Sequence, residues 1–519
     1  MTSHIKKNIK HVVVLMLENR STDNLIGWLY DDNCKPRHFL PEGSPDSYNG
    51  LAGTDYANPL DLNDPSTAVK ATKGVENLRV PNPDPNENFK YMNRQLFGLD
   101  IDLKTKGWLP PEGTTPGMIG FLDDYTKAKC SNDKIAPQIM GTYTNEDLSV
   151  LSNLAKSYAV SDNYHASCPT QTWPNRAFMH AGTSLGRVNN FPYQPYDAPT
   201  IFNAFEECHH SWNVYKSSEI IPSLTRIQMV QLWDPSLDEH FQHISKFIQD
   251  CKTGDLPAYS FLEPSFVIEK GADATSEHPP ANVCAGEHYL QTIWQAISNS
   301  PAFDETLFII NFDEHGGCPD HVPPNWTAKS PGLDSSPGDL DFYFNRYGVR
   351  VPAIFVSPHI NEKTVFRASK DPWSEQSVPY DHTSILAMLL DWKGIDRSKL
   401  QSDRVHCAPS NPFDELLAGN SREDSPKLKA NCQLTKQNCW LRLVNFIRNL
   451  FGFCADGYSL TSLQQSIIVA DAHYRKYRAS PDTFQLGSEE QFVSQDQINE
   501  LLKNIKTEAD MVNYFKALK

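Results

Sequence analysis

Residues 307–322 read LFIINFDEHGGCPDHV and join a continuous apolar run to a dense group of polar residues. The run at 307–312 is the strongest strand candidate in the chain. It shows no polar alternation, which is typical of a strand covered on both faces. Ligands of open α/β sheets bind beyond the carboxyl ends of the strands. The stretch therefore predicts a buried strand with a site at its end.

Similar apolar runs recur far away in the sequence, at residues 11–17, 258–262 and 351–357. Helical patterns lie between them, for example at 290–297 and 384–390. Strands that alternate with helices predict an α/β fold with a mostly parallel sheet.

The chain divides into a predicted catalytic domain, residues 1–405, and a helical C-terminal extension, residues 406–519. Within the first, residues 30–136 are rich in Pro, Asn, Asp and Gly and predict an irregular insertion of the kind that forms lids or rims. In the second, residues 440–451 and 460–477 predict amphipathic helices, followed by a flexible polar tail.

The composition excludes two classes of partner. The 519 residues carry a formal net charge of −16, which argues against nucleic acid because no basic excess exists to replace counterions. No apolar stretch reaches the roughly 18 residues of a membrane-spanning helix, so membrane contact is predicted to be peripheral. Oligomeric state is left open.

The N-terminus carries no recognisable Sec signal, because its apolar run at 12–17 is too short and Glu18 follows at once. We therefore expect a cytoplasmic protein in the producing cell. The tail with Glu489 and Glu490 is a candidate export signal for a specialised secretion system, which would make the protein a secreted virulence effector. A solubilising terminus is the alternative.

The 11 cysteines are an odd number and include no C-x-x-C pair, which argues against a zinc ribbon. Without a signal peptide, reduced cysteines are predicted. A disulfide cluster of Cys432, Cys439 and Cys454 is the less favoured alternative.

Polar segments also follow the first strand and open a later helix. Glu18 and Asn19 offer oxygen ligands to a cation, although a plain polar loop explains them as well. Pro174 fits the first turn of a helix, which places Thr172 at the positive end of that helix. A threonine hydroxyl is a nucleophile only when a base or a metal lowers its pKa, so a plain N-cap is the alternative.

The segment after residue 312 is better explained by function than by structure. Asp313, Glu314, Asp320 and His321 suit Zn²⁺, Mn²⁺ or Fe. His382 opens the helix near 384–390 and is a ligand, a general acid or a local hydrogen-bonding residue.

Two further histidine segments are weaker. His278, in the sequence Glu-His-Pro-Pro, is a lesser candidate, and the pair His209 and His210 is interpreted as structural. Together, a hydroxyl, paired acids and histidines suit attack on phosphorus beside a metal. Glu18, Asn19, Asp313 and Glu314 would hold that metal next to Thr172.

Five motifs carry a resemblance to a known family. They are ENRSTD at 18–23, TWPNR at 172–176, EHPP at 277–280, DEHGGCPDHV at 313–322 and DHTS at 381–384. In this order they resemble the phosphoesterase family of bacterial phospholipases C and acid phosphatases, which includes plant non-specific phospholipases C. The likeness spans about residues 8–395. Thr22, Cys318 and Pro319 depart from the family pattern without removing a proposed ligand.

The resemblance implies an alkaline-phosphatase-like three-layer α/β/α fold. It implies that Thr172 is the nucleophile and forms a transient phosphothreonine, and that Glu18, Asn19, Asp313 and Glu314 bind a metal. Zn²⁺ is the favoured ion, with Mn²⁺ or another as alternatives, and Asp320 is added to the ligands. His278, His321 and His382 would surround the phosphate and either protonate the leaving group or bind further ions.

Arg176 and Trp173 are predicted to contact the substrate. Trp173 either faces a choline-like head group through a cation–π contact or packs at the start of its helix.

The predicted function is that of a metal-dependent phospholipase C, a phosphoric diester hydrolase acting on glycerophospholipids such as phosphatidylcholine at a membrane surface. The products would be diacylglycerol and a phosphorylated head group. The alternatives are an acid phosphatase acting on phosphomonoesters and a catalytically silent membrane- or effector-binding protein.

Overall fold

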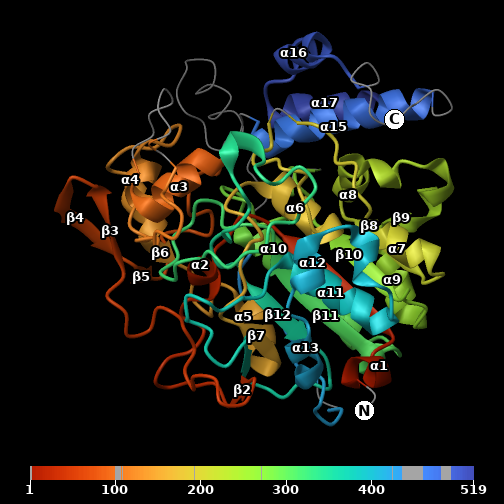
Figure 1. The fold of residues 1–519 in the computed structure, drawn as a ribbon, viewed down its shortest axis with the longest axis horizontal. Coiled ribbons are helices and arrows are strands. Elements are labelled where there is room, and N and C mark those ends of the chain that lie inside the picture. Colours follow the sequence, from red (N-terminus) through yellow and green to blue (C-terminus); the bar gives the residue numbers. More distant parts are fainter. Residues whose placement is uncertain are drawn as a thin grey trace.

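The computed structural model describes residues 3–99, 107, 109–191, 193–269, 272–422, 425–434, 460–480 and 492–518. A nine-stranded sheet forms its centre (Figure 1). In spatial order the strands are β2 (His38–Leu40), β13 (Thr364–Phe366), β7 (Ala159–Ser161), β12 (Ala353–Val356), β11 (Thr306–Phe312), β1 (His11–Leu17), β10 (Tyr259–Glu263), β8 (Trp212–Lys216) and β9 (Phe241–His243).

The sheet is mostly parallel. Only β12 runs against its neighbours β11 and β7, and the other pairs of strands are parallel. Every residue of β11 is buried, as the unbroken apolar run predicts for a strand covered on both faces. The four strands that the sequence predicts are all present: β1 has the predicted bounds, and the ends of the other three differ by at most two residues.

Helices cover both faces and complete a three-layer α/β/α arrangement (Figure 1). Helices α5 (Ser149–Ser157), α9 (Ile244–Thr253) and α10 (Val283–Ser298) form one contacting group. A second group contains α6 (Thr172–Ala181), α7 (Ile201–Glu207), α11 (His382–Lys393) and α12 (Asp403–Cys407). The predicted fold class, a mostly parallel sheet between helical layers, is confirmed.

The insertion at residues 30–136 is more regular than the sequence suggests. It contains the edge strand β2, the antiparallel pair β3 (Ala57–Asp61) and β4 (Asp64–Lys70), the short β5 (Thr72–Lys73), α3 (Phe89–Phe97) and α4 (Phe121–Thr126). Strand β5 pairs with β6 (Gly141–Thr142). The prediction of an irregular excursion did not include these elements, because each of them is short, so neither helical nor strand periodicity extends far enough to be seen.

The remaining helices are α1 (His4–Asn8), α2 (Thr22–Ile26), α8 (Leu224–Gln228), α13 (Asn411–Leu416), α15 (Ser462–Ala479), α16 (Gln495–Asn504) and α17 (Glu508–Ala517). Helix α15 confirms the helix predicted at 460–477 and contacts α8 of the first 405 residues. The predictions at 440–451 and for the Glu489–Glu490 tail lie outside the described residues.

The prediction of reduced cysteines was wrong. Cys284 in α10 forms a disulfide with Cys432, 148 residues later, and Cys130 is also disulfide-bonded. The spacing of the cysteines in the sequence does not predict this disulfide, because the two residues meet only where the C-terminal segment packs against α10. Cys439 and Cys454 lie outside the described residues.

Among the described residues, no helix combines the length and apolar character needed to cross a lipid bilayer.

Candidate active site

The site lies where β1 and β11 end. These strands pair in parallel with Leu17 opposite Phe312, so the residues that follow them meet at one edge of the sheet. The backbone N–H of Asn19 donates to Oδ1 of Asp313 over 3.0 Å. The sequence pattern thus brings the two predicted ligand segments together as expected.

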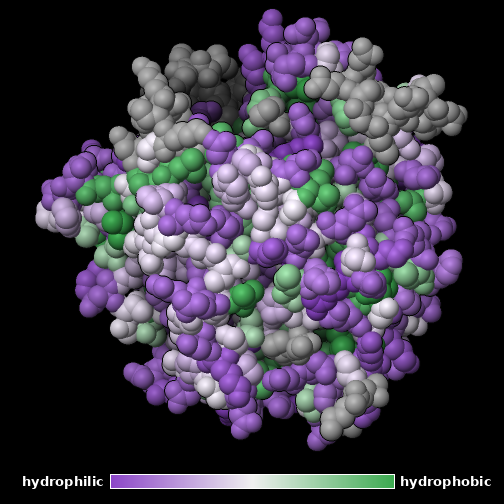
Figure 2. Space-filling model, viewed as in Figure 1, coloured by the Kyte–Doolittle hydropathy of each residue, from purple (hydrophilic) through white to green (hydrophobic). Residues whose placement is uncertain are grey.

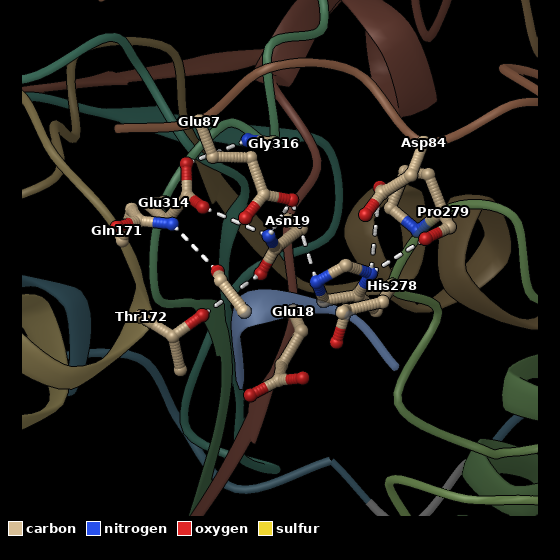
Figure 3. Close-up of polar contacts among 12 residues, drawn as sticks. Glu18, Asn19, Asp84, Glu87, Gln171, Thr172, His278, Pro279, Glu314 and Gly316 are labelled. Carbon is tan, nitrogen blue, oxygen red and sulfur yellow. Dashed lines mark hydrogen bonds and ion pairs between the residues drawn. The ribbon is translucent and has the colours of Figure 1, made fainter. Parts of the chain in front are cut away.

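Thr172 stands at the first residue of α6, where the positive end of the ten-residue helix points at the site. Its side chain is fully buried, and Oγ1 donates to Oδ1 of Asn19 at 3.3 Å (Figure 3). The predicted nucleophile therefore contacts a predicted metal ligand directly.

The amide nitrogen of Asn19 lies between two acids. It donates to Oε1 of Glu314 at 2.8 Å and to Oε1 of Glu87 at 2.7 Å (Figure 3). The second oxygen of Glu314 accepts the backbone N–H of Gly316 at 2.7 Å. Burial raises the pKa of the Glu314 carboxyl well above its usual value, and the neighbouring Glu87 adds to the shift.

The buried acids fit a divalent cation. Among the described residues, Oε2 of Glu18 and Oδ2 of Asp313 are buried and have no hydrogen-bond partner. Burial raises the pKa of both carboxyls, and the nearby Arg176 opposes both shifts. Unsatisfied buried carboxylate oxygens are costly unless they bind a cation or take up a proton. Oxygen ligands of this kind suit the ion predicted beside Thr172.

Arg176 is held by these acids. Its Nε donates to Oε1 of Glu18 at 3.1 Å and lies 3.8 Å from Oδ2 of Asp313, and the side chain is buried. The predicted substrate-binding residue is therefore a partner of two carboxylates that are predicted metal ligands.

Trp173 packs at the start of its helix, which is one of the two roles that the sequence allowed. Its ring is fully buried, with its centroid 5.0 Å from that of Tyr193. The indole N–H donates to the hydroxyl of Ser466 in α15. These contacts tie α6 to the C-terminal extension.

His278 joins the site through two acids. Its Nε2 lies 3.3 Å from Oε1 of Glu87, and its Nδ1 lies 3.7 Å from Oδ1 of Asp84 (Figure 3). Burial lowers the pKa of His278 to about 4, so the ring is neutral at pH 7. Of the three predicted histidines, this one shares a neighbour, Glu87, with Asn19.

His382 lies behind Asp313. Its Nε2 is 2.7 Å from the backbone oxygen of Asp313, and its Nδ1 is 3.1 Å from the hydroxyl of Tyr164. Both ring nitrogens are thus occupied by the protein, and burial lowers the pKa of His382 to about 4. The side chain positions the strand end that carries Asp313.

Asp320 and His321 belong to a separate cluster. Nε of Arg350 donates to Asp320 at 2.9 Å. Nδ1 of His321 lies 2.6 Å from Oδ2 of Asp23, and its Nε2 lies 3.0 Å from Oδ1 of Asn49. The side-chain contacts recorded for Asp320 and His321 run to this cluster and not to Thr172.

Sequence reasoning missed Asp84 and Glu87. Both lie in the proline-rich segment before α3, which the pattern assigns to an irregular insertion. The only local signal is a pair of acids three residues apart, and nothing in it indicates that the segment reaches Asn19.

The site combines a buried threonine hydroxyl at a helix N-terminus with acid and amide side chains at the carboxyl edge of a mostly parallel sheet. This is the edge at which open α/β proteins bind their ligands. The chain belongs to the Phosphoesterase family, whose pattern matches residues 9–395.

Named relatives agree with this family. The chain is 32% identical to non-specific phospholipase C3 of Arabidopsis thaliana over 391 residues, which are 73% of this chain and 69% of that protein. It is 27% identical to phospholipase C B of Mycobacterium tuberculosis over 474 residues, 82% of this chain and 81% of the other. The protein is a hydrolase of phosphate esters, and the predicted family is confirmed.

One solved structure that matches part of the chain is a protein in the alkaline phosphatase superfamily from Vibrio parahaemolyticus. It is 13% identical, covers 50% of this chain and 64% of its own, and superposes with a TM-score of 0.30.

Proposed function

We propose that the protein is a metal-dependent phospholipase C that cleaves glycerophospholipids such as phosphatidylcholine, with Thr172 as the nucleophile. The observation that carries the proposal is the contact of the Thr172 hydroxyl with Asn19, inside a group of buried acids with unpaired oxygens. The names of the relatives favour a phospholipase C over an acid phosphatase.

Glu18, Asn19, Asp313 and Glu314 are the residues that would hold the cation. When bound, a divalent ion, with Zn²⁺ favoured, supplies charge stabilisation to the phosphate oxygens and lowers the pKa of a nearby hydroxyl. Arg176 keeps Glu18 and Asp313 oriented toward this position.

Each half of the reaction breaks one bond to phosphorus. Oγ1 of Thr172 attacks phosphorus and loses its proton, while the bond to the glycerol oxygen breaks and that oxygen gains a proton. Diacylglycerol leaves, and the head-group phosphate stays on Thr172. Water then attacks the same phosphorus, releases the phosphorylated head group and returns a proton to Thr172. One water is consumed in total.

Peripheral docking on a zwitterionic surface accords with the charge of the chain. A formal charge of −16 opposes adsorption on anionic lipid. On the face drawn in Figure 2, hydrophobic residues form small separate groups within a largely hydrophilic surface. The insertion exposes Ile119, which is 43% accessible and available for shallow contact with lipid. Co-sedimentation with liposomes that increases with anionic lipid would contradict this proposal.

The central experiment is product analysis on phosphatidylcholine with and without a chelator, with p-nitrophenyl phosphate in parallel. We expect chelator-sensitive release of diacylglycerol and phosphocholine. Thr172→Ala should lower turnover by about 10³-fold or more, whereas Thr172→Ser keeps a hydroxyl and should retain measurable activity. Hydrolysis of the nitrophenyl ester with the lipid untouched would favour the acid phosphatase instead.

A further inference from the structure

The Asn19 amide, whose oxygen accepts the hydroxyl of Thr172, is held by two acids on different segments. It donates to Glu314 after β11 and to Glu87 in the segment before α3 (Figure 3). The two segments are far apart in the sequence. Their relative position decides where the Asn19 amide points, and with it the Thr172 hydroxyl.

The buried side chain of Gln95 in α3 contacts the neighbours of both acids. Its Oε1 lies 2.9 Å from Nε2 of His315, the residue after Glu314. Its Nε2 donates to the backbone oxygen of Asn86, the residue before Glu87, at 2.7 Å. One amide side chain therefore links the two segments that carry the acids.

The surroundings of Gln95 determine which end of its amide faces His315. The oxygen of Asn86 is a backbone carbonyl and can only accept, so the amide nitrogen faces it, and this nitrogen also lies 3.0 Å from Oδ2 of Asp124. The amide oxygen then accepts the Nε2–H of His315. Nδ1 of His315 lies 3.6 Å from Oε2 of Glu314, beyond hydrogen-bond distance, so His315 acts on Glu314 through the backbone.

The turn after Glu314 transmits this contact to the carboxylate. The backbone N–H of Gly316 donates to Oε2 of Glu314 at 2.7 Å. A Cβ at Gly316 would lie 2.2 Å from the backbone oxygen of Asn19, and one at Gly317 would lie 2.8 Å from that of Asn86. The turn is thus enclosed between Asn19 and the insertion, and a shift of the turn would move the N–H that orients Glu314.

Helices α3 and α4 of the insertion hold Gln95 and His315 in place. Next to Gln95, Nε of Arg94 donates to Oδ2 of Asp123 in α4 at 2.9 Å. The ring of Phe121, also in α4, meets the His315 ring edge-on, with the centroids 5.9 Å apart. Both partners of the contact between Gln95 and His315 are therefore fixed by packing within the insertion.

We propose that Gln95 is a positioning residue that holds the two acids around Asn19 in one geometry. The inference rests on the proposed function, because Asn19 and Glu314 are proposed ligands of the catalytic cation. Removing a partner that orients metal ligands typically lowers metal affinity or activity by roughly 10–100-fold. The proposal gives the insertion at residues 30–136 a part in the alignment of the site.

Zinc affinity tests the proposal without substrate. The Zn²⁺ dissociation constant of the full chain is measured by competition with a chromophoric chelator. We expect Gln95→Leu to bind Zn²⁺ about tenfold or more weakly than the wild type. An unchanged zinc affinity in folded Gln95→Leu would overturn the proposal.

Kinetics at saturating Zn²⁺ give a second readout. The substrate is whichever of phosphatidylcholine and p-nitrophenyl phosphate the wild type cleaves. In Gln95→Leu, kcat should fall about tenfold while KM changes little, because alignment of the Thr172 hydroxyl matters most in the transition state. A rise in KM with kcat unchanged would contradict a positioning role.

Gln291→Leu is the matched control. Gln291 is a half-buried amide in α10 whose Oε1 accepts the backbone N–H of Ala430 at 2.8 Å. Both variants lose an amide hydrogen bond and should be less stable, but only Gln95→Leu should lose zinc affinity. An equal loss of zinc affinity in the two variants would reduce the effect to general destabilisation and overturn the proposal.

The variant His315→Phe tests the route of the effect. It keeps a ring against Phe121 but removes the N–H that Gln95 accepts. The double variant with Gln95→Leu should bind Zn²⁺ no more weakly than Gln95→Leu alone, because the same contact is lost only once. Fully additive losses would refute the route through His315. Where Gln95→Leu does not fold, as judged by circular dichroism, His315→Phe replaces it.

The outcomes separate this inference from the function on which it rests. Chelator-sensitive lipid cleavage, with equal zinc affinity in wild type and Gln95→Leu, would leave the phospholipase proposal standing and remove the positioning role. A tenfold loss of zinc affinity in Gln95→Leu, with no lipid cleavage by the wild type, would do the reverse.

Discussion

Two clusters in this molecule combine two carboxylates with one histidine. The open cluster consists of Asp84, Glu87 and His278, and the Arg350 cluster consists of Asp23, Asp320 and His321 with Arg350. By residue type the two are equivalent candidates for a metal. They differ in whether an arginine of the protein is hydrogen-bonded to both acids.

In the Arg350 cluster the acids already have a cation. Arg350 donates to Asp320 at 2.9 Å and to Asp23 at 3.0 Å, and His321 bonds the other oxygen of Asp23. Burial alone would raise the pKa of Asp23, but the charges of His321 and Arg350 outweigh it and lower that pKa.

In the open cluster the acids lack such a partner. Burial raises the pKa of Asp84 well above its usual value, and the adjacent Glu87 raises it further. Burial also raises the pKa of Glu87 to about 8. The comparison teaches that ligand-type residues remain candidates for a metal site only where the protein has not supplied its own cation.

The largest expected effect comes from removing that internal cation. Arg350→Ala leaves Asp23 and Asp320 buried without their guanidinium partner, which should lower the free energy of unfolding by about 3–5 kcal/mol. Urea unfolding in the presence of chelator measures it. Arg37→Ala, which breaks a half-exposed pair with Glu362, is the control and should cost less than about 1 kcal/mol. Similar losses in both variants would mean that Arg350 does not compensate its cluster.

A third buried acid, Glu287, is stabilised by backbone hydrogen bonds. Replacing it should change the free energy of unfolding by a smaller amount that depends on pH. Glu287 faces neither a cation nor a proposed metal and instead accepts the backbone N–H groups of Val150 and Leu151 at 2.6 and 2.9 Å. Burial raises its pKa to about 7, and these hydrogen bonds only partly oppose the shift. The group therefore favours folding at low pH.

Because the folded pKa exceeds the unfolded value of about 4.5, this stabilisation is complete below pH 4.5 and is lost as pH rises through about 7. Between pH 5 and 8, the wild type should lose about 2 kcal/mol of unfolding free energy relative to Glu287→Gln. Urea unfolding at each pH, with chelator present, measures the difference. The control Asp55→Asn, at an exposed acid, should leave the dependence of unfolding free energy on pH unchanged. If wild type and Glu287→Gln show the same dependence on pH, the prediction is refuted.

The sequence predicted where one half of the candidate site lies in the fold. Asn19 and Asp313 follow apolar runs, and the parallel pairing of β1 and β11 places such residues together without further information. Thr172 could be placed because Pro174 marks the start of a helix. For these residues, the local sequence pattern is enough to predict their position in the fold.

The other half depends on long-range packing that leaves no periodic trace. Glu87 reaches Asn19 from a loop whose path is set by its tertiary contacts. Asp320 and His321 stand in the most suggestive motif of the chain, yet their partner Arg350 lies about 30 residues further on, just before β12. The partner of Cys432 is 148 residues away. In each case the residue type is visible in the sequence and its partner is not.

The smallest expected effect is a change in the free energy of unfolding whose sign should differ between the two clusters. In metal-free protein, Asp84→Asn removes a half-buried carboxyl whose pKa is raised by burial, and should raise the free energy of unfolding by about 1 kcal/mol. Asp23→Asn removes a compensated charge and should lower it, because Arg350 and His321 lose a partner. Urea unfolding in chelator at pH 8 measures both. If both substitutions destabilise to a similar extent, the two clusters hold their acids alike.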